Sequence, residues 1–397
     1  MKEKKKILIV HSDLMIGGAE SSLIGLLQSL DYSRVDVTLM LLNPVGDLLA
    51  LVPSEVHLYP TPKPYNDLML PIKDVVFKHF NLPIALSRLL AKRQARGWDG
   101  RTYMTKELAH LHAMKFLPRI EGEYDLALSF IDPHVIVSQK VNAKIRMGWM
   151  HTDISRFIID KVLDEKVWDA LDYAVNVSEA CNKAFQEFYP RLAGKAISIE
   201  NVLSRKYIYS RAEAQDVSSE MPHPEGRTNI LSVGRFTEAK NFKNVSHILK
   251  QVREQGIDAK WYLIGYGNEQ EILDAITETS MQEHCIILGK RDNPYPYIKA
   301  CDIYAQPSIW EGKCVAVREA QILNRPVLIT DYATSHSQLT DGYDGVIAPQ
   351  DNDGCARSLA SLIQDKALQE RLIAGTQKED YTNAKELDKI YRLLDVQ

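Results

Sequence analysis

The feature that most constrains the fold is an alternation of short apolar runs with helical patterns, and it occurs twice along the 397 residues. The runs are nearly continuous in apolar residues, as expected for parallel strands that are buried on both faces. A polar stretch punctuated by Pro and Gly, residues 204–228, separates the two series and indicates a linker. The sequence therefore predicts two Rossmann-like α/β domains, each with a doubly wound parallel sheet, facing each other across a cleft.

The first domain is expected to span residues 1–203 and the second residues 229–380. Residues 381–397 form a last helical pattern with no strand after it, which can cap either domain, including by crossing back to the first. Strands are expected in the first domain at 7–10, 35–42, 124–130, 146–149, 173–177 and 196–199. Strands are expected in the second domain at 229–233, 260–264, 285–288, 302–306, 326–330 and 345–348.

Residues 63–119 interrupt the alternation, because they hold amphipathic helical patterns and no convincing strand. They carry 11 Lys or Arg against 4 Asp or Glu, about +7 in a chain of net charge −4. One interpretation is a helical insertion that lies on an anionic membrane surface with its apolar side chains in the lipid. The other is an insertion that packs these side chains on its own domain, and the two are equally supported. The apolar side chains in question are Phe77, Phe80, Leu82, Leu86 and Leu90.

Composition excludes several classes of protein. The slightly acidic balance gives no reason to expect nucleic acid as a partner. Five scattered cysteines, with no CxxC pair, fit a reducing cytosol and offer no zinc site. The first apolar run is too short for a signal peptide, and no run approaches the roughly 20 residues of a membrane span. We expect a cytoplasmic protein, with a peripheral membrane role left open.

Polar and small residues follow the first-domain strands, where an open α/β sheet places its ligands. Gly17 and Gly18 follow the first strand and would allow a ligand close to the backbone at the start of a helix. His11 ends that strand and His151 follows the 146–149 strand. A lone histidine is more often a satisfied polar residue than a catalytic one, and a bare Gly-Gly pair is a weak signal.

In the second domain, the loop after strand 229–233 carries Arg235 and Lys240. Two cations at a strand's carboxyl end suit a diphosphate and its charge as a leaving group, although they can equally be solvated surface charges. Gly265 and Gly267 form a tight turn after the next strand, near where a nucleotide base could lie.

Two glutamates, Glu311 and Glu319, flank a polar turn and the start of a helical pattern. The break at Gly312 places Glu311 on a loop and Glu319 on the helix. The pair could then hold two parts of one ligand at a helix N-terminus, where free N–H groups favour an anion. For an isolated pair, two surface carboxylates are the better interpretation.

Together these motifs resemble glycosyltransferase family 4, the retaining group 1 glycosyltransferases of GT-B fold that serve bacterial surface-polysaccharide assembly. The resemblance runs in order through nearly the whole chain, and its most specific part is the glutamate pair with its flanking residues. The motifs are GGAE at 17–20, the His of WMHTD, NVSE at 176–179, Asn201, GRFTEAKN at 234–241, GYGNE at 265–269 and ACDIYAQPSIWEGKCVAVREAQ ending at 321.

The resemblance implies a role for each residue. Arg235 and Lys240 would hold the donor diphosphate and Glu319 the ribose hydroxyls, while Glu311 would face the transferred sugar and His151 would lie beside it. Donor contacts are further implied for Gly17, Gly18, Gly265, Gly267 and the backbone of Lys313, Cys314 and Val315.

The chain departs from the family where Gly-Phe-Gly-Leu-Pro often follows the first glutamate, because residues 312–316 read Gly-Lys-Cys-Val-Ala. Lys313 adds a cation there, so residues 313–315 are where a sugar preference is expected to be set. No metal or other cofactor is expected, since Asp351-Asn352-Asp353 begins a helix and is better interpreted as a cap than as a metal-binding DxD.

The predicted function is hexosyl transfer with retention from a nucleotide diphosphate sugar to a saccharide acceptor. The basic insertion suggests a lipid-linked acceptor at the inner membrane face, in capsule, exopolysaccharide or lipopolysaccharide synthesis. Two alternatives remain: a sugar-nucleotide epimerase of GT-B architecture, and a non-catalytic subunit of a glycosyltransferase complex.

Overall fold

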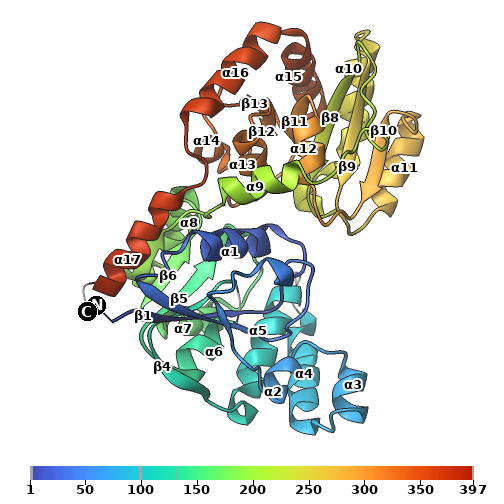
Figure 1. The fold of residues 1–397 in the computed structure, drawn as a ribbon. Helices are drawn as coiled ribbons and strands as arrows, with labels where there is room; N and C mark the ends of the chain where they lie inside the picture. The colour runs from blue at the N-terminus through green and yellow to red at the C-terminus, as the bar shows by residue number, and fades with distance from the viewer. Residues whose placement is uncertain (1–2, 98–100, 132, 396–397) are drawn as a thin grey trace. The chain divides into compact units, whose positions relative to one another are not determined.

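The chain divides into two units in a computed structural model that describes residues 3–97, 101–131 and 133–395. The first unit comprises Met1–Val202 and Ala384–Gln397, and the second comprises Leu203–Asn383. The chain enters the second unit at Leu203 and leaves it near Thr382, where the Leu203 N–H donates to the Thr382 carbonyl at 2.8 Å. Figure 1 shows a sheet with helices around it in each unit.

The first unit is built on a seven-stranded sheet in the order β3-β2-β1-β4-β5-β6-β7, and every pair is parallel. Each predicted strand is present, and β3 is an additional two-residue edge strand with exposed side chains that carries too little pattern to predict. The strands are β1 Lys5–His11, β2 Val35–Leu41, β3 His57–Leu58, β4 Ile120–Ser129, β5 Val141–Met150, β6 Tyr173–Asn176 and β7 Ala196–Ser198.

Helices cover both faces of this sheet, so alternate residues of one strand enter different cores. Along β1, Ile7 and Ile9 lie in one core and Leu8 and Val10 in the other. This explains why the strands read as continuous apolar runs. The helices are α1 Gly18–Ser29, α2 Lys63–Asn66, α3 Ile72–Phe77, α4 Leu82–Gln94, α5 Arg101–Ala113, α6 His134–Lys140, α7 Lys161–Asp169, α8 Glu179–Phe188 and α17 Leu387–Asp395.

Helix α17, at the end of the chain, is part of the first unit. Its buried residues join the same core as Ile7 and Ile9. The Tyr391 hydroxyl accepts the Asp31 N–H at 2.8 Å, and the Arg34 guanidinium lies 4.1 Å from the centre of the Tyr391 ring.

The segment between β3 and β4 is helical, with α2 to α5 in place of strands. Its apolar residues divide into two sets. Val75, Ile84 and Ala91 are buried in the core of the first unit. The interpretation that the other set also packs on its own domain is wrong, because those side chains are exposed. They are Phe77, Phe80, Leu82, Leu86 and Leu90.

The second unit has a six-stranded parallel sheet in the order β10-β9-β8-β11-β12-β13. The order reverses between β8 and β11, and ligands of open α/β sheets bind at the carboxyl ends of strands at such a point. The strands are β8 Thr228–Val233, β9 Ala259–Ile264, β10 Cys285–Gly289, β11 Ile303–Gln306, β12 Val327–Thr330 and β13 Val346–Ala348. The helices are α9 Arg205–Ala212, α10 Val245–Glu254, α11 Gln270–Thr279, α12 Tyr295–Ala300, α13 Val315–Ile322, α14 Ser335–Gln338, α15 Asn352–Gln364 and α16 Lys366–Lys378.

Residues 204–228, expected to be a linker, belong to the second unit. Ser204 caps helix α9 by accepting the Tyr207 N–H at 3.3 Å. Ile208 of α9 and Met221 beyond it are buried in the core of the unit. A few widely spaced apolar residues in a polar background anchor this segment. Because their spacing is not periodic, it does not predict a helix.

The fold class of the two domains is confirmed, since both sheets are parallel and flanked by helices. Among the described residues, no helix is long and apolar enough to cross a membrane.

Candidate active site

The loops that follow β8 and β9 run side by side, and two glycines make this possible. The Phe236 N–H donates to the Tyr266 carbonyl at 2.7 Å. A Cβ on Gly265 would lie 1.9 Å from the Gly234 carbonyl oxygen. Gly267 has a φ of +138°, and a Cβ there would lie 2.6 Å from the Phe236 carbonyl oxygen. Both glycines are therefore required by the close approach of the two loops, which fixes the path of the chain toward Lys240.

Lys240 and Glu311 meet at the point where the strand order reverses. Lys240 follows β8 and Glu311 follows β11, and the Lys240 Nζ lies 2.5 Å from Glu311 Oε1. The same Nζ lies 3.4 Å from Cys314 Sγ. Burial alone would lower the pKa of Lys240, but the neighbouring Cys314 and Glu311 outweigh it and raise that pKa. Lys240 is thus a fixed cation. Arg235 lies on the same loop with its side chain exposed.

A chain of hydrogen bonds connects Glu311 to the core of the second unit. The Tyr304 hydroxyl donates to Gln306 Oε1 at 2.9 Å, and Gln306 Nε2 donates to Ser308 Oγ at 3.1 Å. Ser308 Oγ then donates to Glu311 Oε1 at 2.7 Å. Tyr304, Gln306 and Ser308 are all buried. Because each member is both oriented and satisfied by the next, the carboxylate of Glu311 is held in one position.

Helix α13 begins beside this carboxylate. Cys314 is its N-cap, and the Cys314 N–H donates to Gln338 Oε1 at 2.7 Å. No side chain within the described residues caps the helix itself, so its first amides can serve an anion. The Lys313 ammonium donates to the Ser337 carbonyl at 2.6 Å. Lys313 is therefore directed at helix α14, and its backbone, rather than its charge, lies at the start of α13.

Glu319 lies further along α13 and is buried, with 5% of its surface exposed. Its Oε1 accepts the Tyr295 hydroxyl of α12 at 2.8 Å. Burial raises the pKa of Glu319 to about 7, and the hydrogen bond from Tyr295 opposes that rise. The Tyr295 ring in turn contacts Tyr207 of α9 edge to face, with centroids 5.9 Å apart. Glu319 is thus a carboxyl whose charge changes near neutral pH.

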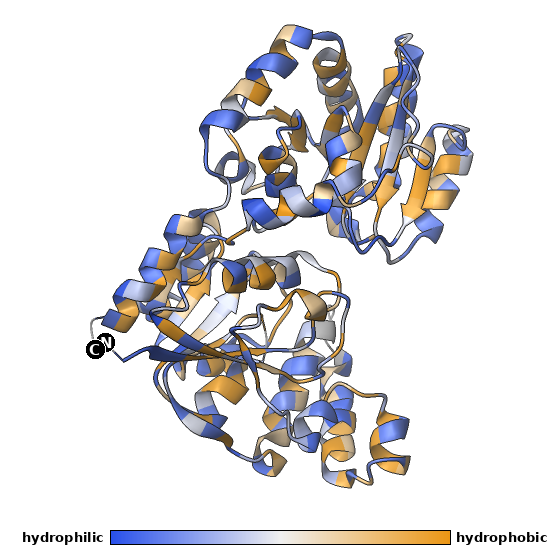
Figure 2. Ribbon diagram, in the orientation of Figure 1, coloured by the Kyte–Doolittle hydropathy of each residue, from blue (hydrophilic) through white to orange (hydrophobic). Residues whose placement is uncertain are grey.

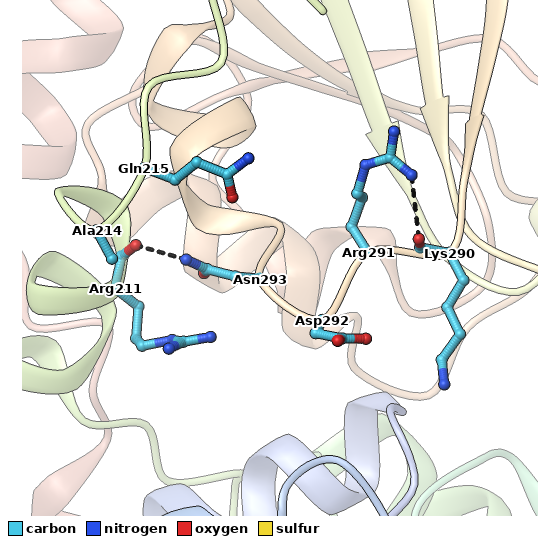
Figure 3. Close-up of a pocket in the computed structure, with 7 residues that line it drawn as sticks. All are labelled: Arg211, Ala214, Gln215, Lys290, Arg291, Asp292 and Asn293. Atoms are coloured by element: carbon cyan, nitrogen blue, oxygen red, sulfur yellow. Dashed lines mark hydrogen bonds between the residues drawn. The ribbon is translucent and has the colours of Figure 1, made fainter.

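A basic hollow of about 380 Å³ opens between α9 and the loop after β10 (Figure 3). Asn293 joins its two sides by donating through Nδ2 to the Arg211 carbonyl at 2.7 Å. Arg291 donates to Tyr297 at 3.0 Å and pairs with Glu220. The lining residues are Arg211, Ala214, Gln215, Lys290, Arg291, Asp292 and Asn293. Because Arg211 comes one turn after Tyr207 on α9, the hollow continues the row of side chains that starts at Glu319.

In the first unit, Gly17 is the N-cap of α1 and Gly18 is its first residue. A Cβ on Gly17 would lie 2.1 Å from Glu20 Oε2, so the glycine makes room for this carboxylate. Glu20 Oε1 lies 3.6 Å from Nε2 of the buried His11. Burial would raise the pKa of Glu20, but His11 more than compensates and lowers it. The start of α1 therefore already holds a negative charge that comes from the chain itself.

His151 lies directly after β5 in the first unit. Its ring centroid is 4.7 Å from that of Phe130, and both ring nitrogens are enclosed. Burial lowers the pKa of His151 to about 3, so the ring is neutral at physiological pH. It therefore carries no charge to offer a ligand.

Asp351 is the N-cap of α15, as predicted, and its Oδ1 accepts the Gly354 N–H at 2.7 Å. The part of the chain that the structure describes contains no group of three or more His, Cys, Asp or Glu side chains able to hold a metal ion.

The structure brings Lys240, Glu311 and Cys314 into direct contact. Glu319 lies one turn further along α13 and contacts Tyr295 instead, whereas Gly17, Gly18 and His151 lie in the other unit. Sequence reasoning missed several residues that hold the site, because each comes from a separate element and no motif marks it. They are Tyr295, Gln338 and the basic residues of the hollow.

The fold and this site together define a two-domain α/β protein of the GT-B class. Residues 214–379 match the family described as glycosyl transferases group 1. The predicted family resemblance is therefore confirmed, and the matched residues lie in the second unit.

Curated relatives match less than half of the chain. The N-acetylgalactosamine-N,N'-diacetylbacillosaminyl-diphospho-undecaprenol 4-alpha-N-acetylgalactosaminyltransferase of Campylobacter jejuni is 27% identical over 164 residues, which cover 41% of this chain and 43% of that protein. The amylovoran biosynthesis glycosyltransferase AmsD of Erwinia amylovora is 29% identical over 145 residues, covering 36% and 40%. Each match thus spans less than half of the relative.

Solved structures match nearly the whole fold. HepE of Anabaena, solved with UDP and glucose, superposes with a TM-score of 0.69 at 16% identity, covering 98% of this chain and 99% of that one. A mutant of TarM from S. aureus, solved with fondaparinux, alpha-GlcNAc-glycerol and UDP, gives a TM-score of 0.69 at 12% identity, covering 98% and 99%. At these identities the likeness establishes the fold alone.

Proposed function

We propose that this chain is a retaining glycosyltransferase that moves a hexosyl group from a nucleotide diphosphate sugar to a lipid-linked saccharide, in the synthesis of a bacterial surface polysaccharide. The observation that carries the proposal is the contact between Lys240 and Glu311 beside α13, the helix that also carries Glu319, at the strand reversal of the family-matched unit. The names of the relatives, one acting on a diphospho-undecaprenol saccharide and one in amylovoran biosynthesis, support the acceptor class.

The reaction breaks the bond between the anomeric carbon and the donor phosphate oxygen, and the diphosphate leaves with the electron pair. Lys240, Arg235 and the α13 amides would stabilise that charge as it develops, which is where electrostatic stabilisation accelerates a reaction. The acceptor oxygen bonds to the same face of the anomeric carbon, and its proton passes to the departing phosphate. Retention follows from attack on the face that the diphosphate leaves.

The other roles are proposed from the family resemblance, together with the contacts of each residue. Glu319 would accept hydrogen bonds from the ribose hydroxyls, and the hollow next to Tyr207 and Arg211 would take the rest of the nucleoside. Glu311, held by Ser308 and Lys240, would face the transferred sugar. His151 would lie beside that sugar as a neutral ring. We expect neither metal nor cofactor, so activity should survive a chelator.

A donor screen tests the proposal. One nucleotide sugar should bind and, with a lipid-linked saccharide extract, give a product whose new anomeric centre has the configuration of the donor by NMR. Glu319→Gln should weaken donor binding by roughly tenfold or more, the size expected for losing hydrogen bonds to a charged group. The control is Glu278→Gln, which removes an exposed carboxylate of α11 and should leave donor binding unchanged.

The alternatives give different products. An epimerase would release an altered sugar without acceptor, and a non-catalytic subunit would bind donor but show turnover only after a partner protein is added. The proposal would be contradicted if the wild type bound no nucleotide sugar and if Glu319→Gln behaved like the wild type in the same binding screen.

A further inference from the structure

The hairpin of α3 and α4 in the first unit exposes an unusual amount of apolar surface. Phe77 is 73% exposed and Phe80 is 79% exposed, the highest values among the exposed large hydrophobic side chains. Four leucines of α4 are also exposed. They are Leu82, Leu86, Leu89 and Leu90. Figure 2 shows hydrophobic colouring along both helices of this hairpin.

Helix α4 is apolar on two opposite faces. At about 100° per residue, Ile84 and Ala91 lie together on one face with Ala95, the C-cap of the helix, and this face is buried in the core. The exposed leucines occupy an arc on the other side, with the spacing i, i+4, i+7 and i+8 that defines one helical stripe. A helix that needed only to attach to its own domain would have a polar outer face. The second stripe therefore indicates a partner outside the unit.

The turn between the helices is built to hold Phe80 outward. Phe80 has a φ of +53°, a left-handed conformation that is unfavourable for a bulky residue. The buried Asp67 fixes the two residues that flank Phe80. Its carboxylate contacts His79 Nδ1 at 2.5 Å and accepts a hydrogen bond from Asn81 Nδ2 at 2.7 Å. Arg88 donates to the Asp67 carbonyl at 3.0 Å. A strained, anchored turn that leaves a phenylalanine in solvent indicates a function for that ring.

Charge identifies the kind of partner. Residues 72–97 contain six Lys or Arg and one Asp, while the whole chain is net negative. Lys92 and Arg93 are exposed at the end of the leucine stripe, and Lys73 and Lys78 are exposed on α3 and just after it. The one acidic residue, Asp74, already pairs with Lys78 at 3.1 Å. Exposed Phe and Leu flanked by Lys and Arg are the composition of surfaces that insert into anionic lipid headgroups.

We propose that the α3–α4 hairpin docks the protein on an anionic lipid bilayer, with Phe77, Phe80 and the leucine stripe entering the headgroup region. This inference deepens the proposed function and rests on it in one respect, because a lipid-linked acceptor would be met at that surface. Clustered positive charge argues against a second copy of the hairpin as the occupant, since two such faces would repel each other.

Co-sedimentation with vesicles tests the docking surface without donor or acceptor. The full chain should bind vesicles of phosphatidylcholine with phosphatidylglycerol, and bind vesicles of phosphatidylcholine alone more weakly. Phe77→Ser combined with Leu86→Ser should reduce the partition coefficient by about tenfold or more, because each large apolar side chain contributes to insertion. Val162→Ser with Leu273→Ser, at exposed sites of α7 and α11, is the matched control.

Phe80→Gly separates docking from folding. Glycine adopts a positive φ without strain, so this variant should keep or raise the unfolding temperature while its vesicle binding falls. Lys92→Glu with Arg93→Glu should weaken binding by roughly fivefold per charge at low salt. The matched control is Lys250→Glu with Lys378→Glu, which changes the net charge equally at exposed sites of the second unit.

Three results would overturn the proposal: no vesicle binding by the full chain, equal loss in the control variants, or a fall in molecular mass by sedimentation velocity when the Phe and Leu residues are replaced. The last would make the hairpin a contact between copies. Donor binding is measured on the same samples. If vesicle binding fails while donor binding persists, the docking inference alone is wrong.

Discussion

Glu319 changes charge in the physiological pH range, because burial raises its pKa to about 7. If its ionised form accepts the ribose hydroxyls, donor affinity should fall as pH decreases through 7. Tyr295→Phe removes the hydrogen bond that favours the ionised form, so it should move the midpoint of that fall to higher pH. Glu319→Gln should bind weakly with no such midpoint. Titration calorimetry with a nucleoside diphosphate between about pH 6 and pH 8 measures all three.

The same carboxyl should act on stability in the opposite direction. Its folded-state pKa lies above the unfolded value of 4.5. The unfolded chain therefore loses this proton first, and the free energy of unfolding should fall as pH rises from 4.5 to about 7. Urea unfolding of the wild type and Glu319→Gln isolates the contribution. If the pH midpoint of donor affinity were the same in Tyr295→Phe as in the wild type, the role assigned to Glu319 would be contradicted.

The strands of both sheets were predictable from the sequence because burial on both faces makes each a continuous apolar run. Helix α9 and the exposed strand β3 were not predictable from the sequence. Helix α9 is held by isolated apolar residues such as Ile208, and β3 has only two residues. Glu311 and Lys240 stood in motifs, so they could be proposed. Gln338 and Tyr295 reach the site from other elements, and only the three-dimensional structure brings them there.

The paired loops after β8 and β9 should depend on Gly265. In Gly265→Ala the new Cβ would meet the Gly234 carbonyl, which is backbone and cannot rotate away. We expect a loss of about 1–3 kcal/mol in unfolding free energy, as for other overpacked sites. Donor affinity should fall as well, because Lys240 lies on the displaced loop. Gly194→Ala, which meets nothing within 4 Å, is the control. Equal stability of both variants by urea unfolding would show that the loops can separate freely.

The chain leaves the first unit at Val202 and returns to it at Ala384, so the first unit is built from two separate stretches of the sequence. Helix α17 is the returning segment, and it completes a core that the first 202 residues leave open. Ile390 and Leu394 are buried there, and Lys389 donates to the Ser198 carbonyl at 2.8 Å. The first unit therefore cannot reach its full stability until helix α17 has been made and has packed.

Ile390→Ala tests this dependence. Removing a buried isoleucine costs about 2–5 kcal/mol, a large share of the stability of one domain. The loss should appear in the first unit alone, as faster amide hydrogen exchange in β1 and β2 with β8 and β9 unchanged. Arg392→Ala, at an exposed site of the same helix, should leave amide exchange unchanged in the strands of both units. Leu359→Ala, buried on α15, should give the reverse pattern, with loss in β8 and β9 only. If Ile390→Ala weakened both sheets equally, the two units would unfold as one cooperative body, and the division of the chain at residues 202 and 384 would not describe its energetics.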